Sequence, residues 1–335
     1  MTADRSALFP RNPDPTLAHR PQARWFAAGL LASALVIAGM MIYNRLVLKL
    51  TDPGFLTLIA VLTGLMTVRY RTRAASTLTA ARFRDFSEHA AVMITICVLG
   101  AVASYEAAAD TSGFVDAALA HSDRMLHFDW VALYRLVASH PLLQRLGAAA
   151  YGSIYVTPTV LIGWMAWHGR REAAHRFLAT FWLASVLTLV LFPLLPARGA
   201  LEFLWHGPIR YMPTSGLYQG EIIPGLRAHT VAAIDLGTVR GLVCAPSFHT
   251  ACAIIYMVTA WQFAALRPLL VPVNVAMLLS TPVEGTHYLT DMILGAIVAV
   301  FAIAAVRLIA QRQGQPTTGN GRALAGKASA SPGLA

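Results

Sequence analysis

Two short polar segments interrupt the apolar second half of this 335-residue chain. The first reads PSFHT over residues 246–250, and the second reads STPVEGTHYLTD over residues 280–291. Each directly precedes or enters an apolar run. Ionisable residues at the rim of such runs are costly to place there, so they are candidates for function. A serine, two histidines and an aspartate could bind an anion, transfer a proton or act as a nucleophile.

The first segment has the composition of a helix start. Pro246 suits the first turn of a helix, because its missing N–H would have no partner there. The free N–H groups of that turn, together with the helix dipole, favour an anion such as phosphate, and Ser247 adds a hydroxyl donor. His249 would lie within reach of the same anion. A simple capping role for these residues stays open at this point.

The second segment places a histidine and a carboxylate four residues apart. On a helix, His287 and Asp291 would lie on one face. The carboxylate could then hold the proton of one ring nitrogen and leave the other nitrogen directed outward, as a nucleophile or general base requires. The pair could instead be a structural hydrogen bond. We favour a catalytic role for the pair, because both polar segments are expected to open on the same membrane face.

Composition indicates a membrane protein. The chain is 56% hydrophobic and 13% charged, against about 25% charged residues in ordinary soluble domains. Its apolar residues come in blocks long enough to cross about 30 Å of hydrocarbon. The three cysteines follow neither a disulfide framework nor a zinc-binding spacing. The net charge of +10 is spread over short connections, which favours a role in membrane orientation over nucleic-acid binding.

The apolar blocks predict an all-α, polytopic transmembrane bundle of about eight helices. The expected spans are 25–48, 54–69, 89–109, 148–168, 175–196, 247–264, 268–282 and 288–310. Prolines interrupt the seventh, so its backbone needs neighbouring helices. Residues 110–147 are expected to form one or two amphipathic interfacial helices. Residues 197–246 are expected to form a long functional loop.

The expected domain organisation follows from these blocks. Residues 1–24 and 311–335 are expected to be disordered ends, because their composition is polar and of low complexity. Residues 25–88 would add two helices and a basic loop to a membrane domain at 89–310. Most lysines and arginines fall on the side of the two termini. Both termini are therefore expected to be cytoplasmic in a cell membrane, and both polar segments to open on the extracytoplasmic face.

The two polar segments resemble signature motifs of the type 2 phosphatidic acid phosphatase superfamily. The motif PSGH is matched, apart from Phe248 in place of glycine, by Pro246, Ser247 and His249. The motif SRxxxGxHxxxD is matched, apart from Thr281 in place of arginine, by Ser280, Gly285, His287 and Asp291. This resemblance implies a six-helix catalytic core within residues 89–310. It also implies a membrane-bound lipid phosphatase or phosphotransferase.

The departures from that superfamily concern its cations. Its first motif, KxxxxxxRP, is absent, which together with Thr281 removes three cations expected around a phosphate monoester. A phosphodiester has one negative charge and needs fewer. The pattern PSFHT followed by GxHYxxD is similar to the branch of inositol phosphorylceramide synthase, which moves an inositol-phosphate head group between lipids. Candidate phosphate ligands in the 197–246 loop are Arg227, which best matches that branch, and Arg198, Arg210 and Arg240. Each could instead bind lipid head groups at the interface.

The resemblance also implies a mechanism. His287, oriented by Asp291, would attack phosphorus and form a phosphohistidine, while His249 protonates the leaving alcohol. His249 would then deprotonate the acceptor, which is a lipid alcohol or water. The charge on the phosphoryl oxygens would be stabilised by backbone N–H groups and by Ser247, Arg227 and Arg198. The expected partner is a membrane lipid, no metal or other cofactor is implied, and the oligomeric state stays undetermined.

Two other functions were weighed against this interpretation. A transporter or scramblase-like protein would line a substrate path with these residues. It predicts inverted repeats and polar residues through the membrane depth, and neither is evident in the sequence. A metal-dependent membrane hydrolase would use His249, His287 and Asp291 as ligands, but a further strong ligand spacing such as HExxH is missing.

Overall fold

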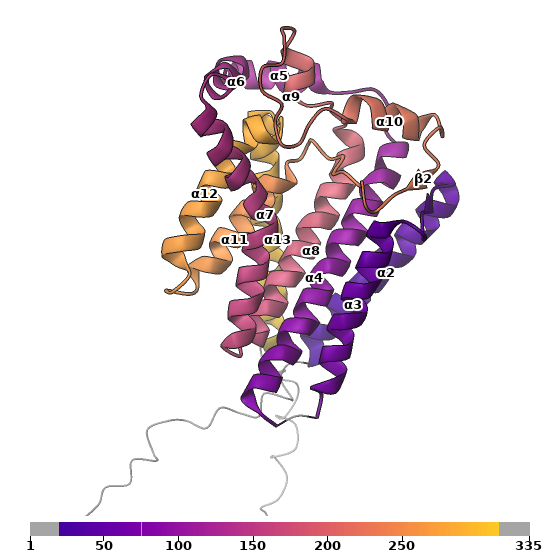
Figure 1. Ribbon diagram of the computed structural model, residues 1–335, viewed down its shortest axis with the longest axis vertical. Coiled ribbons are helices and arrows are strands. Elements are labelled where there is room, and N and C mark those ends of the chain that lie inside the picture. The colour runs from indigo at the N-terminus through magenta and orange to yellow at the C-terminus, as the bar shows by residue number, and fades with distance from the viewer. Residues whose placement is uncertain (1–19, 75, 315–335) are drawn as a thin grey trace, which may run out of the picture.

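A computed structural model of the protein shows a bundle of helices with a cap of shorter helices and loops at one end (Figure 1). It describes residues 20–74 and 76–314, so most of the predicted disordered ends, 1–24 and 311–335, lies outside the described residues. Within the described part, the strands are β1 (Val47–Leu48) and β2 (Ala233–Ile234), which pair in parallel. The all-α fold class is confirmed.

Eight helices of the described chain run along the bundle. They are α2 (Arg20–Asn44), α3 (Pro53–Arg71), α4 (Leu78–Ala109), α7 (Pro141–Trp167), α8 (Arg171–Leu191), α11 (Phe248–Trp261), α12 (Arg267–Glu284) and α13 (Leu289–Gly314). Each overlaps one expected span. Six of them are long and apolar enough to cross a membrane, whereas α11 is a shorter apolar helix and α12 contains Pro272 and Pro282. The protein is therefore a membrane-embedded helical bundle.

Two helices begin earlier than their apolar blocks. α4 begins at Leu78, inside the expected connection 70–88, and Thr77 caps it by accepting a hydrogen bond from the backbone N–H of Ala80. α7 begins at Pro141 rather than near residue 148. Proline is favoured at a first helical position. The charged first turns of α4 lie outside its apolar block, and the start of α7 continues into the segment that was expected to form a separate amphipathic helix.

The two long connections form the cap. The first contains α5 (Asp116–Met125) and α6 (Trp130–Ala138), which confirms the prediction of short helices there. The second contains α9 (Ala200–Leu204) and α10 (Gln219–Arg227), after the 3-10 helix η2 (Phe192–Leu194). The cap is tied to the end of α12 by hydrogen bonds from Trp130 Nε1 to Pro282 O (2.8 Å) and from Tyr211 to Glu284 Oε1 (2.6 Å).

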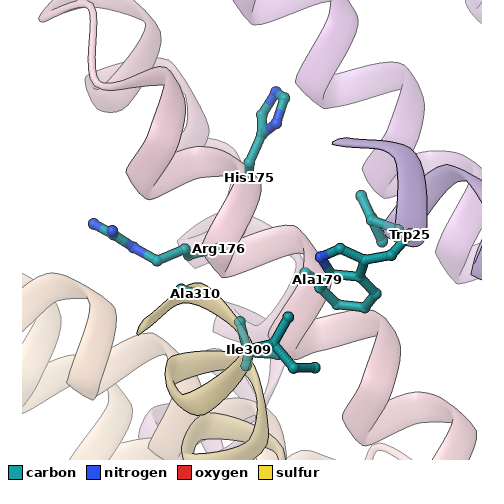
Figure 2. A pocket seen from close by; sticks show the side chains of 8 residues that line it. Trp25, His175, Arg176, Ala179, Ile309 and Ala310 are labelled. Atoms are coloured by element: carbon teal, nitrogen blue, oxygen red, sulfur yellow. The ribbon is translucent and has the colours of Figure 1, made fainter. Parts of the chain in front are cut away.

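The opposite end of the bundle brings together the start of α2, the start of α8 and the end of α13. Figure 2 shows side chains from all three helices around one small pocket, among them Trp25, His175, Arg176, Ala179, Ile309 and Ala310. The ring centroid of Trp25 lies 6.1 Å from that of Trp182 in α8. The start of α2 and the end of α13 therefore lie at the same end of the bundle, away from the cap.

Helix α13 begins on a hydrogen-bond acceptor that the cap supplies. The buried carboxylate of Asp123 in α5 accepts hydrogen bonds from the backbone N–H groups of Leu289 (2.9 Å) and Thr290 (2.8 Å) and from the Thr290 hydroxyl (2.7 Å). The first N–H groups of a helix have no partner within it, and a negative charge there also suits the helix dipole. Asp123 thus fixes the first turn of the helix that contains Asp291.

We expect Asp123→Ala to lower the free energy of unfolding by about 1–3 kcal/mol, because buried donors lose their acceptor. The measurement is thermal unfolding of the purified protein in detergent. Asp129→Ala is the matched control, since Asp129 caps α6 at the surface by accepting from the Ala132 N–H. Equal losses in the two variants would contradict the role assigned to Asp123.

Candidate active site

The structure brings the two predicted histidines together. Their ring centroids lie 6.2 Å apart, and the ring planes are inclined by 54°. His249 belongs to the first turn of α11, and His287 to the short loop between α12 and α13. Two groups at this separation can each approach a single tetrahedral phosphoryl group at hydrogen-bond distance, about 3 Å. The two polar segments therefore form one site.

The loop that carries His287 is held by the cap. Thr286 has a left-handed backbone (φ 52°), which reverses the chain between the two helices, and its carbonyl accepts a hydrogen bond from the Ala200 N–H at 2.7 Å. Gly199 (φ 105°) makes this approach possible, because an added Cβ would lie 2.7 Å from the Thr286 hydroxyl. The position of His287 thus depends on the start of α9.

Asp291 lies beside His287, as expected, but the two do not share one helix face, because His287 precedes α13, which begins at Leu289. Oδ1 of Asp291 is 3.2 Å from Nδ1 of His287. The carboxylate is fully buried, and its Oδ2 accepts hydrogen bonds from the Tyr288 N–H (3.0 Å) and the Cys244 thiol (3.4 Å). Oδ1 has no partner with hydrogen-bond geometry, so the contact with His287 is a close approach that is not aligned. Nε2 is left as the ring nitrogen available to a substrate.

Cys244 is a site residue that sequence analysis missed. It is buried, and its Sγ lies 4.0 Å from His287 Nδ1 in addition to its contact with Asp291. In the described part of the chain, these three residues form the group whose potential metal-ligating atoms lie within 4.8 Å of one another. The metal-ligand set considered from the sequence was His249, His287 and Asp291. In the structure, the third member of the group is Cys244 and not His249. The sequence feature that could have indicated Cys244 is its position two residues before the PSFHT segment.

Tyr151 in α7 is a second residue that was missed. Its ring stacks on that of His249, with centroids 4.1 Å apart and planes inclined by 12°, and its hydroxyl lies 3.2 Å from His249 Nδ1. This contact fixes the imidazole and leaves Nε2 for a substrate. Gly285 lies close to the rings of His287 and Tyr151 and leaves them room, because an added Cβ would lie 2.4 Å from His287 Cδ2 and 3.0 Å from Tyr151 Cε2.

Ser247 has the capping role that the sequence left open, whereas Pro246 is not where it was expected. Helix α11 begins at Phe248, so Pro246 precedes the helix instead of lying in its first turn, and Ser247 is the N-cap. The Ser247 hydroxyl accepts hydrogen bonds from the N–H and the hydroxyl of Thr250, which leaves its own proton free to donate. The Ser247 N–H donates to the carbonyl of Asp291 at 3.0 Å, which joins the two segments directly.

Helix α13 can approach this N-cap because it has a glycine at the crossing. A Cβ on Gly295 would lie 2.2 Å from the carbonyl oxygen of Ser247. In α12, Thr281 occupies the position where the motif SRxxxGxHxxxD has arginine. Its side chain is fully buried, and its hydroxyl donates to the Met277 carbonyl within the same helix. No cation from this position reaches the imidazoles.

The two predicted phosphate ligands, Arg198 and Arg227, lie over the same aromatic ring. Each guanidinium carbon is 4.6 Å from the ring centroid of Phe114. Arg227 donates hydrogen bonds to the Thr111 hydroxyl (2.8 Å) and the Gly113 carbonyl (2.6 Å), and it forms no ion pair with a described residue. Burial and the charge of Arg198 lower the pKa of Arg227. A bound anion would act in the opposite direction and raise the pKa of Arg227.

Arg198 is connected to the loop of His287 through a buried carboxylate. Asp116 in α5 accepts hydrogen bonds from the Arg198 N–H and from the hydroxyl of Tyr288, the residue after His287. The Arg198 side chain is half-exposed, and its Nη1 lies 3.8 Å from Glu202 Oε1. Of the other loop arginines, Arg240 lies over the ring of Tyr218, and Arg210 is exposed.

Comparison with protein families gives a match to the PAP2 superfamily over residues 117–305. The matched segment is more than half of the 335-residue chain. It contains both polar segments, the cap and most of the bundle from α5 onward, and it leaves α2, α3 and α4 outside. No curated protein and no solved structure matches the chain. The match and the paired histidines lead to one conclusion: this chain belongs to the PAP2 superfamily.

Proposed function

We propose that the protein is an integral-membrane lipid phosphotransferase or phosphatase that works through a phosphohistidine on His287. One observation carries this proposal: imidazoles from two separate segments lie 6.2 Å apart, and one of them has Asp291 3.2 Å from its Nδ1. This arrangement supplies a nucleophile and a separate proton donor to one phosphorus atom.

In the first step, Nε2 of His287 attacks the phosphorus of a phosphoester, and the bond from phosphorus to the leaving oxygen breaks. His249 enters this step protonated and gives its Nε2 proton to the leaving oxygen. The Nδ1 proton of His287 faces Asp291, whose carboxylate stabilises the positive charge that develops on the ring. A small rotation of the imidazole would align this contact as a hydrogen bond.

In the second step, neutral His249 takes a proton from the acceptor, a lipid alcohol or water. The acceptor oxygen attacks phosphorus, the bond between phosphorus and Nε2 breaks, and His287 returns to its starting state. An alcohol gives head-group transfer, whereas water gives hydrolysis. None of these steps calls for a metal ion, so we expect turnover to persist in the presence of a chelator.

A phosphodiester is the substrate class that the charges favour. Two arginines, Arg198 and Arg227, lie near one phenyl ring, and the position of Thr281 provides no cation. The site therefore has fewer cations than the superfamily's motifs would supply, and a phosphodiester with one negative charge needs fewer of them than the dianion of a monoester. This supports head-group transfer between lipids, like that of inositol phosphorylceramide synthase. The Ser247 hydroxyl would donate to a phosphoryl oxygen.

We further propose that both termini are cytoplasmic and that the site opens on the extracytoplasmic side of the cell membrane. The outer ends of α2 and α13 lie on one side of the bundle and the cap on the other (Figure 1). The larger share of Lys and Arg falls on the side of the termini, which is typical of cytoplasmic faces.

The direct test of this function is a product analysis. Purified protein would be incubated with a panel of labelled phospholipids, with and without ceramide or diacylglycerol as acceptor. We expect a labelled head group on the acceptor, or a released phosphoester or phosphate when water accepts. Absence of any product across the panel, with the protein folded and inserted in lipid, would contradict the proposal.

We expect His287→Ala to reduce turnover of the accepted lipid to the background rate, because no other group in the proposed mechanism forms the covalent intermediate. Folding and membrane insertion should be retained. His168→Ala is the matched control, since His168 is exposed at the end of α7 away from the cap. Wild-type turnover in His287→Ala would refute the assignment.

His249→Ala should lose most activity toward alkyl phosphoesters, whose leaving oxygen must be protonated. The loss should be much smaller for an aryl phosphoester with a weakly basic leaving group, because that oxygen can depart without a proton. The measurement is the ratio of kcat/KM for the two substrates in the variant and the wild type. An equal loss for both substrates would argue against His249 as the proton donor.

Arg227→Ala should raise KM for the phosphodiester by about tenfold, with a smaller change in kcat, because it removes a charged hydrogen bond to the substrate. Arg267→Ala is the matched control, since Arg267 is exposed at the start of α12 and lies over Trp261. If Arg198→Ala raises KM and Arg227→Ala does not, the phosphate ligand is Arg198.

A further inference from the structure

Three buried side chains next to the reacting nitrogen have the donor atoms of a transition-metal site. Cys244 Sγ lies 3.4 Å from Asp291 Oδ2 and 4.0 Å from His287 Nδ1, and His287 Nδ1 lies 3.2 Å from Asp291 Oδ1. Around a tetrahedral zinc ion with bonds of about 2.0–2.3 Å, neighbouring ligand atoms are about 3.3–3.7 Å apart. The first and last of the three measured distances involve different oxygens of Asp291; with one donor atom from each residue, the three atoms lie within 4.8 Å of one another. They would have to close by about 1 Å at most to occupy three corners of such a tetrahedron.

The orphaned oxygen of Asp291 is independent evidence for a ligand at this position. Asp291 is fully buried, yet Oδ1 has no hydrogen-bond partner, although His287 Nδ1 is only 3.2 Å away. A buried acceptor without a partner is costly, and a cation between the two atoms would satisfy both.

The charges also balance. A thiolate on Cys244 and the carboxylate of Asp291 carry two negative charges, which a divalent cation cancels within a buried site. Binding would release the thiol proton to solvent. One sulfur, one imidazole nitrogen and one carboxylate suit Zn²⁺, whereas Mg²⁺ and Ca²⁺ require oxygen ligands.

We propose that Cys244, His287 and Asp291 form a zinc site whose occupation reversibly inhibits the enzyme. The inhibition rests on the function proposed above. Three protein ligands would leave the fourth position of a tetrahedral zinc ion to water or to an oxygen of the substrate, as in other sites of this kind. None of the residues has to leave the site for zinc to bind.

Zinc inhibits because it changes which nitrogen of His287 holds the proton. In the active form, Nδ1 carries the proton toward Asp291, and Nε2 keeps the lone pair that attacks phosphorus. Zinc takes the lone pair of Nδ1, so the neutral ring carries its proton on Nε2. A protonated Nε2 has no lone pair for the attack, and Asp291 no longer stabilises a positive ring.

The first test measures zinc binding without activity. Full-length protein, stripped with a chelator, is titrated with Zn²⁺ against a chromophoric chelator, and with Co²⁺ to observe the thiolate-to-cobalt absorption band. We expect one Zn²⁺ per chain and a thiolate band. In Cys244→Ser, which keeps the size of the side chain, we expect zinc affinity at least about tenfold weaker and no thiolate band.

Cys252→Ala is the matched control, because Cys252 is also buried and free, further along α11. It should bind zinc and cobalt as the wild type does. Failure of the wild type to bind zinc stoichiometrically, or equal zinc affinity in Cys244→Ser and the wild type, would overturn the proposal.

The second test separates this inference from the proposed function. Turnover is measured in excess chelator and then with added Zn²⁺. We expect activity in chelator, loss of activity with zinc, recovery with more chelator, and a zinc midpoint at least about tenfold higher in Cys244→Ser. Activity that zinc does not affect would overturn the zinc site alone. Activity that appears only when zinc is added would overturn both the proposed inhibition and the metal-free phosphohistidine mechanism.

Discussion

The site depends on one buried contact, that between the Asp291 carboxylate and the imidazole of His287. A carboxylate with no exposure to solvent must be held by nearby donors, and here these are the Tyr288 N–H and the Cys244 thiol. The surrounding fold positions the loop of His287 and the helix of Asp291 for this contact. Asp123 fixes the first turn of α13, Thr286 reverses the chain before it, and Gly295 lets α13 pass against the start of α11.

The cap is therefore part of the site as well as its cover. Two of its buried carboxylates, Asp116 and Asp123, accept hydrogen bonds from Tyr288 and from Thr290, which follow His287 in the chain. The start of α9 supports the loop before His287, because the Ala200 N–H donates to the Thr286 carbonyl. The same cap supplies both arginines that lie over Phe114. The cap thus both holds the loop of His287 and carries the two arginines that we propose as phosphate ligands.

Sequence patterns located the site well and its surroundings less well. The spacing of His287 and Asp291 predicted their contact, and apolar blocks predicted every bundle helix. The early starts of α4 and α7 were missed because the charged first turns of α4 lie outside its apolar block and the start of α7 lies in a segment expected to form a separate helix. Cys244 and Tyr151 were missed because only the packing of α7 and the 241–247 loop brings them to the imidazoles. The N-cap role of Ser247 was an open alternative, and the structure decides it through the hydrogen bonds from Thr250 to the Ser247 hydroxyl.

The most direct test of the account is to trap the covalent intermediate. Protein turning over a lipid labelled in its phosphate would be quenched in base, digested, and mapped by mass spectrometry. The account predicts a phosphoester or phosphoryl group on His287 that survives base and is released by acid. Continuous turnover with no label on the protein, or a label on His249 or another residue, would contradict it.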